Sequence, residues 1–313
     1  MLKKFTIKKL CLSSFCLLVL LILYLFPKKN INNFNFQSTV YKSANLKDVV
    51  FLEDENGYIT RITTHLDGTD LVGKAKDIVK TLTESNNDVQ GFKSLIPKNT
   101  YVNKISLNKN DLSIDFSSDF LNVKPQNSEK MIESIIYSLT ELKDVKNIYI
   151  SVDNILLDKL PNTNIKMEQP LNRSFGINKV YDIESIKDTN KTTTYFLSKK
   201  NNYTYYVPVT KISNDSREKI EIIINELSSS NSYTTSLKSY LNSEAALNSY
   251  EILDKKMLLD FNNALYANSI DRDIEEEVTY SINLSIKDSY DVDEVLYSVD
   301  NEKIATFNLK ELD

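Results

Sequence analysis

Two aspartates at matching places in the chain are the best candidates for chemistry. Asp115 lies in the stretch LSIDFSSDF (112–120), and Asp260 lies in MLLDFNNAL (257–265). Paired carboxylates can act as general acid and base, or they can bind calcium. Each aspartate is followed within two residues by Ser or Asn, which form turns, so its carboxylate can instead accept hydrogen bonds from the next backbone N–H groups. We favour this structural role.

The other polar residues lack the partners that a catalytic or metal site needs. His65 is the only histidine, and the two cysteines, Cys11 and Cys16, are both near the amino terminus, so a zinc site is not expected. The acidic run at 271–277 lacks the glycine and spacing of a calcium loop, and Asp119 has no acidic match in the second stretch. We predict no catalytic, cofactor-binding or metal-binding residue and no cofactor.

The two stretches belong to a duplication. Asp115 and Asp260 are 145 positions apart (260 − 115). The same or a similar shift matches four further landmarks: Phe51-Leu52 with Phe196-Leu197, Ile78 and Leu82 with Ile223 and Leu227, Tyr137-Ser138 with Tyr280-Ser281, and Val152-Asp153-Asn154 with Val299-Asp300-Asn301. A period this long indicates a small domain copied once and not a solenoid repeat.

Composition agrees with two ordinary globular domains. The chain has 313 residues, of which 41% are hydrophobic and 26% are charged. Its net charge of −5 argues against a nucleic-acid partner, because phosphate binding needs clustered Lys and Arg. No cysteine follows residue 16, which excludes disulfides and Cys-ligated clusters from the rest of the chain.

The amino end predicts a membrane anchor. Lysines precede an apolar run at 10–26, which Pro27 and two more lysines close. At about 1.5 Å per residue the run spans roughly 26 Å, enough for a short transmembrane helix. The alternatives are a cleaved signal peptide, for which small residues are missing at the cleavage site, and a buried helix. The lysines predict a cytoplasmic amino terminus and a single pass through the cell membrane, with the following domains outside the cytoplasm.

Periodicity gives each copy a mixed α+β pattern. In the first copy, strands are expected near 49–52, 58–62, 102–107, 112–116 and 145–152, and helices at 74–83 and from a capping Ser128 to about 142. The second copy repeats this with strands at 194–197, 203–209, 256–261, 295–299 and 304–309, and helices at 217–227 and 273–284. Each unit is a helix-backed mixed sheet, in the order ββαββαβ.

These boundaries divide the chain into five parts. We predict an anchor at 1–29, a spacer at 30–46, a first repeat at 47–155, a connection at 156–192 and a second repeat at 193–313. The connection is longer than a usual loop, so part of it is expected to pair as a strand or to pack between the repeats.

Three short stretches carry a resemblance to a known family. They are Leu95-Ile96-Pro97 with Thr100, Ile114-Asp115-Phe116-Ser117, and the passage 135–152 with its Ser138-Leu139-Thr140-Glu141. On these residues the chain resembles the GerM family of sporulation and spore-germination proteins, which carry two tandem GerMN domains behind an amino-terminal membrane signal. The likeness covers about 48–154 and 193–301. The chain departs from the family in lacking its Gly-Pro after the first helix, in a diverged second copy, and in lacking a lipobox.

The resemblance implies a non-enzymatic protein that acts through protein–protein contacts in the assembly joining mother cell and forespore. GerMN domains are similar to ring-building modules of secretion machines, which implies partners among other sporulation envelope proteins and self-association, for which exposed edge strands are a physical route. The alternative is a peptidoglycan-binding module in septal or spore wall remodelling, in which some of the 18 tyrosines would stack on sugars.

Overall fold

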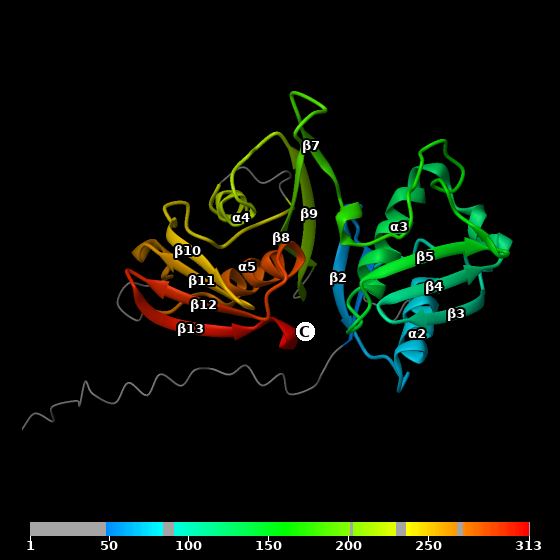
Figure 1. Cartoon of the computed structure of the whole chain (residues 1–313), viewed down its shortest axis with the longest axis horizontal. Helices are drawn as coiled ribbons and strands as arrows, with labels where there is room; N and C mark the ends of the chain where they lie inside the picture. Colours follow the sequence, from blue (N-terminus) through cyan, green and yellow to red (C-terminus); the bar gives the residue numbers. More distant parts are fainter. Residues whose placement is uncertain (1–47, 84–90, 201–202, 230–235, 268–271, 313) are drawn as a thin grey trace, which may run out of the picture. The chain divides into compact units, whose positions relative to one another are not determined.

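The computed structural model describes residues 48–83, 91–200, 203–229, 236–267 and 272–312 (Figure 1). Residues 43–313 belong to one compact unit. The anchor predicted at 10–26 and the spacer lie outside the described ranges. Within those ranges, every helix is too short or too polar to cross a bilayer.

Both repeats follow one order of elements. The first comprises β1 (Asp48–Glu53), β2 (Ile59–Thr64), α2 (Leu71–Thr83), β3 (Val102–Asn108), β4 (Asp111–Phe116), the 3-10 turn η2 (Ser118–Asn122), α3 (Pro125–Leu139), β5 (Asn147–Val152) and β6 (Ile155–Leu156). The second comprises β8 (Asn190–Lys200), β9 (Tyr203–Ser213), α4 (Lys219–Ser228), β10 (Leu247–Leu253), β11 (Lys256–Phe261), η4 (Asn263–Leu265), α5 (Glu276–Ser289), β12 (Glu294–Val299), β13 (Glu302–Asn308) and η5 (Leu309–Glu311). The α+β class and the ββαββαβ order are confirmed. The structure adds β6 to the predicted strands of the first repeat and β10 to those of the second, whose closing strand β13 was predicted at 304–309.

Three sheets hold these elements together (Figure 1). Each repeat has a small sheet, ordered β3-β4-β5-β6 in the first and β10-β11-β12-β13 in the second. In each, the central pair is parallel and the outer pairs are antiparallel, because α3 or α5 carries the chain back between the parallel strands. The first hairpins of both repeats join a third, central sheet, in which β2 pairs with β9.

The connection contributes to that central sheet. Its η3 (Arg173–Phe175) precedes β7 (Val180–Asp182), which pairs in parallel with the end of β9. Part of the connection therefore forms a strand, as its length suggested.

The helices bury one apolar face, but α2, α3, α4 and α5 all begin two or three residues from the predicted start. On α3, Ile132, Ile135 and Ile136 are fully buried, and the helix contacts both β1 and β2. The predicted start at Ser128 was wrong: α3 begins at Pro125, because proline is preorganised for a first helical turn. Similarly, α5 begins at Glu276 instead of at 273 and continues to Ser289.

The match between the first strands of the two repeats is shifted by one residue from the prediction. Glu53 in β1 and Leu197 in β8 each form an isolated bridge with a lysine. Leu197 therefore corresponds to Glu53, and Phe51 corresponds to Tyr195 and not to Phe196. The prediction was misled by adjacent large apolar residues, which look alike in sequence and point to opposite faces of a strand.

The match between α3 and α5 was wrong by four residues. Ser138 Oγ accepts a hydrogen bond from the Phe51 backbone N–H (2.8 Å), and Ser285 Oγ accepts one from the Tyr195 N–H (2.9 Å). Ser138 therefore corresponds to Ser285 and not to Ser281. A four-residue error is about one helical turn, so it preserves the buried face and leaves the apolar pattern intact.

Candidate functional site

Asp115 lies near the end of β4 and joins neighbouring strand ends. Its carboxylate accepts hydrogen bonds from Asn103 Nδ2 (3.0 Å), Ser151 Oγ (2.6 Å) and the Asn154 backbone N–H (2.8 Å). The residue is 5% exposed. Burial disfavours the charge, but these hydrogen bonds hold the pKa of Asp115 below its ordinary value. The ionised carboxylate thus links β3, β5 and the turn after β5 to β4 within its own sheet.

Asp260 has the same surroundings in the second repeat. It accepts hydrogen bonds from Asn248 Nδ2 (3.2 Å) and the Asn301 backbone N–H (2.8 Å). Burial opposes ionisation, while hydrogen bonds from Asn301, Ser298 and Asn248 hold its pKa below the ordinary value. Asp260 lies in a different sheet from Asp115, so the two do not face each other across one site.

The structure gives these aspartates partners that the sequence did not predict. The donors come from β3 or β10, from β5 or β12 and from the turn that follows β5 or β12. None is a backbone N–H group that directly follows the aspartate. Asp115 and Asp260 each hold together a bulged edge strand and a strand end.

The remaining candidates lie apart from one another. His65 directly follows β2, with Nε2 3.5 Å from Asp67 Oδ1 and both side chains largely exposed. Asp119 accepts a hydrogen bond from Asn122 Nδ2 (3.1 Å) on η2. Asp271 lies outside the described ranges, and the later part of the acidic run leads into α5. Across residues 48–312, outside the gaps, no three His, Cys, Asp or Glu side chains are grouped to hold a metal ion.

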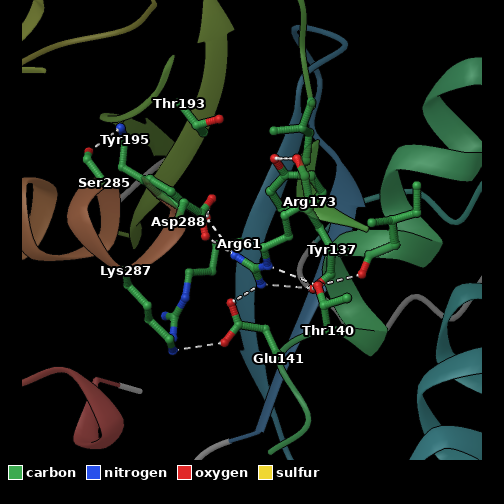
Figure 2. A network of polar contacts seen from close by, with 12 residues as sticks. Arg61, Tyr137, Thr140, Glu141, Arg173, Thr193, Tyr195, Ser285, Lys287 and Asp288 are labelled. Carbon is green, nitrogen blue, oxygen red and sulfur yellow. Dashed lines mark hydrogen bonds and ion pairs between the residues drawn. The ribbon is translucent and has the colours of Figure 1, made fainter. Parts of the chain in front are cut away.

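Arg173, which sequence reasoning missed, is the centre of a buried polar network (Figure 2). Its guanidinium forms an ion pair with Glu141 Oε1 (Nη2, 2.6 Å) and another with Asp288. It also donates from Nε to Thr140 Oγ1 (2.9 Å) and from Nη2 to the Tyr137 carbonyl (3.2 Å). Arginine suits such a place, because its planar fork of donors can satisfy several acceptors at once.

The two carboxylates around Arg173 are equivalent residues of the two repeats. Glu141 follows Ser138 by three positions, and Asp288 follows Ser285 by three. Glu141 also pairs with Lys287 of the second repeat (Oε2 to Nζ, 3.1 Å). One guanidinium from the connection therefore binds the carboxyl-terminal ends of both equivalent helices. We call Arg173, Glu141, Lys287 and Asp288 the junction cluster.

Burial sets the electrostatics of the junction cluster. The side chains of Glu141 and Asp288 are 9% and 2% exposed. Burial alone would favour a neutral Glu141, but Lys287 and Arg173 hold its pKa well below the ordinary value. Burial raises the pKa of the Tyr195 phenol, which donates to Asp288 Oδ2 (2.9 Å) and stays neutral. Burial raises the pKa of Asp288 above its ordinary value, and the ion pair with Arg173 opposes that shift. The cluster thus joins two acids and two cations.

Further contacts tie the repeats together along the central sheet. Asn178 of the connection donates from Nδ2 to the carbonyls of Ile59 (2.8 Å) and Pro208 (2.7 Å), one from each repeat. The Tyr205 hydroxyl donates to Asp54 Oδ2 (3.0 Å). The candidate site is thus a structural junction between two domains.

One signal for the junction was available in the sequence. Only four of the 38 basic residues are arginines, and one of them lies in the middle of the Asn-rich connection. Arginine is the usual cation of buried ion pairs. Its acidic partners, Glu141 and Asp288, could be recognised as a pair only with the correct match between α3 and α5.

Comparison with known proteins finds matches for both repeats. The family model Germane, described as sporulation and spore germination, matches residues 49–158 and 193–305. The spore germination protein GerM of Bacillus subtilis (strain 168) is 27% identical over 270 residues, which cover 83% of this chain and 73% of that protein. The solved tandem GerMN domains of the sporulation protein GerM from Bacillus subtilis superpose with a TM-score of 0.75 at 26% identity, covering 82% of this chain and 92% of the solved one.

Proposed function

Because the chain belongs to the Germane family of sporulation and spore-germination proteins, we propose that it is a non-enzymatic, membrane-anchored scaffold of that process. It acts by protein–protein contacts outside the cytoplasm, in the assembly that joins mother cell and forespore. The observation that carries the proposal is the likeness to GerM, which extends over both repeats together and not over one domain alone.

The junction cluster supports a scaffold role. A scaffold must present two binding surfaces at a fixed spacing, and flexibly linked domains do so poorly. Here Arg173 and Asn178 of the connection bind groups of both repeats, and β2 pairs with β9 across the repeats. The pair of GerMN domains thus acts as one body.

The membrane anchor is the second part of the proposal. The apolar run at 10–26 spans the cell membrane once, and the lysines before it keep the amino terminus in the cytoplasm. Other sporulation envelope proteins then meet the GerMN domains on the far side of the membrane.

The test is deletion of the gene, scored by the yield of heat-resistant spores and by vegetative growth rate. The proposal expects a large drop in spores at normal growth, restored by the full chain. Two variants of the complementing chain form a matched pair. Arg173→Met removes the cation of the junction cluster, and Arg217→Met is its control, because Arg217 pairs with Asp215 on an exposed loop. Normal spore yield in the deletion strain would refute the sporulation role.

Binding of the purified chain to isolated cell wall tests the alternative, a peptidoglycan-binding module. Retention on the wall that is lost after digestion of the glycan would replace the protein-contact mechanism with wall binding. Absence of retention would reject that alternative.

A further inference from the structure

The loop that joins β7 to β8 carries apolar side chains into solvent. We call residues 183–189 the connection loop. All ten residues from 181 to 190 are exposed. Ile186 at the middle of the loop is 89% exposed, Ile183 is 38% exposed, and Tyr181 on β7 is 63% exposed. Single exposed apolar residues are common on protein surfaces, whereas three within six positions form a local apolar patch.

The connection loop is ordered without a core of its own. The Asn214 side chain, directly after β9, accepts at Oδ1 from the N–H groups of Glu184 (2.8 Å) and Ser185 (3.0 Å). Its Nδ2 donates to the carbonyls of Ser185 (3.0 Å) and Lys187 (2.8 Å). The backbone is thus fixed on both sides of Ile186. A loop that is already ordered loses little conformational entropy when it binds.

The fold does not require an isoleucine at this place. Asn214 bonds backbone groups of the loop, so it would hold the same conformation with a polar side chain at position 186. The Ile186 side chain contributes almost nothing to the core, because it is exposed. A rigidly presented aliphatic side chain is suited to be an anchor, since its burial in a pocket of another molecule is favourable.

The surroundings of the loop are acidic. The charged residues of 182–188, of the adjacent segment 211–217 and of Glu226, which Lys211 binds, give a net charge of −2: Asp182, Glu184, Asp188, Asp215 and Glu226 against Lys187, Lys211 and Arg217. Lys211 and Arg217 are already paired with three of these acids. Within the described residues, Glu184 and Asp188 form no ion pair. An apolar tip between two unpaired carboxylates is therefore what a partner would meet.

This combination selects one kind of partner. Anionic lipid and nucleic acid attract basic patches and would be repelled by Glu184 and Asp188. A second copy is poorly suited as well, because its own loop carries the same negative charge and the whole chain has a net charge of −5. A protein pocket that is apolar inside and basic at its rim complements both features of the loop.

We infer that the connection loop is a docking surface for a different protein, with Ile186 entering an apolar pocket edged by Lys or Arg. This rests on the proposed function, to which it adds the contact surface and the chemistry of the partner. The loop lies in the connection, which occurs once, so each molecule presents one such surface.

Site-directed photocrosslinking in sporulating cells tests the inference with the full chain. A benzophenone amino acid replaces Tyr181, which exchanges one exposed aromatic side chain for another and leaves Ile186 intact. The control probe replaces Tyr101, which is 64% exposed and lies in the first repeat before β3. Irradiation should give a discrete protein adduct from position 181 and little or none from position 101.

Second-site variants in the chain with the probe at 181 test the pocket and its charge. Ile186→Asp should lower the adduct yield about tenfold, whereas Ile186→Leu should preserve it. Glu184→Lys with Asp188→Lys should lower the yield about threefold to tenfold, because both carboxylates then repel a basic rim. Glu251→Lys with Asp254→Lys makes the same change on two exposed acids of the β10 hairpin and should leave the yield unaltered.

Several outcomes would overturn the inference. A lipid contact gives no shifted protein band at position 181, and chance collision gives equal adducts at 181 and 101. An adduct that carries two different tags from co-expressed chains would identify a second copy as the partner. A yield that is unaltered by Ile186→Asp or by the loop charge reversal would reject the pocket or its basic rim.

Spore yield keeps this inference separate from the proposed function. A large drop in spores in the deletion strain, without an adduct from position 181, rejects the docking surface alone. A charge-dependent adduct in a strain whose spore yield is indifferent to the gene rejects the sporulation role alone.

Discussion

Replacing Arg173 by methionine should destabilise the tandem unit more than the loss of an exposed ion pair would. The change removes the cation between Glu141 and Asp288 and leaves two carboxylates whose side chains are 9% and 2% exposed. Breaking a buried ion pair on one side costs about 3–5 kcal/mol. Lys287 still neutralises Glu141, so we expect about 3–4 kcal/mol. In a unit of this size that corresponds to a melting temperature lower by roughly 6–16 °C.

The assay is urea unfolding of residues 43–313, the compact unit, followed by circular dichroism. Arg217→Met is the matched control, because Arg217 pairs with Asp215 at 2.7 Å while its side chain is 48% exposed, and it should cost at most about 1 kcal/mol. Adding Glu141→Gln and Asp288→Asn to Arg173→Met should recover part of the loss, since no unpaired charge then remains buried. Equal losses for Arg173→Met and Arg217→Met would refute this account of the junction.

Three further changes test other contacts by the same unfolding assay. Ser138→Ala leaves the Phe51 N–H without its acceptor and should lower the free energy of unfolding by about 1–2 kcal/mol. Ser128→Ala removes a buried hydroxyl that has no hydrogen-bond partner and should be close to neutral. A larger loss for Ser128→Ala than for Ser138→Ala would contradict the role of Ser138 as acceptor for β1. Asn178→Ala should cost about 2 kcal/mol, because carbonyls of both repeats lose a donor; an unchanged midpoint would show that the bridge is dispensable. The lowered pKa of Asp115 contributes stability that is fully present above the pKa of the unfolded chain, about 3.9, and is lost as pH falls through the folded pKa. Asp115→Asn should therefore reduce the loss of stability that the protein shows below about pH 4. The same acid dependence in the variant and the natural chain would contradict this role of Asp115.

The fold could be predicted from the sequence where periodicity was strong. The alternation in 112–116 and the apolar face of α3 placed β4 and that helix, and the internal repeat then supplied their counterparts. The strand β10 was missed, because its sequence LNSYEIL alternates weakly and a bulge between Leu247 and Ser249 interrupts its ladder with β11. Such a strand forms because β11 offers it a partner, and local sequence does not record that.

The site was harder to predict because its parts come from distant segments. The aspartates could be recognised as structural, but their donors lie 12 to 41 positions away in neighbouring strands and turns. The junction cluster combines residues from the end of α3, the connection and α5, with Glu141 two positions beyond the last residue of α3. It depends on an equivalence between Glu141 and Asp288 that the sequence match had displaced by a helical turn. A shared apolar face cannot fix helical register, and only the hydrogen bonds of Ser138 and Ser285 did so.

The single arginine at the junction also bears on how such a protein evolves. Two separate copies of one domain, each with its own identical sequence, would bring two arginines or none to a shared pair of acids. Here one residue serves both, and it lies in a segment that exists only once, between the repeats. After fusion, loss of Arg173 could not be compensated by the other copy. The two halves therefore depend on one residue that lies outside both repeats.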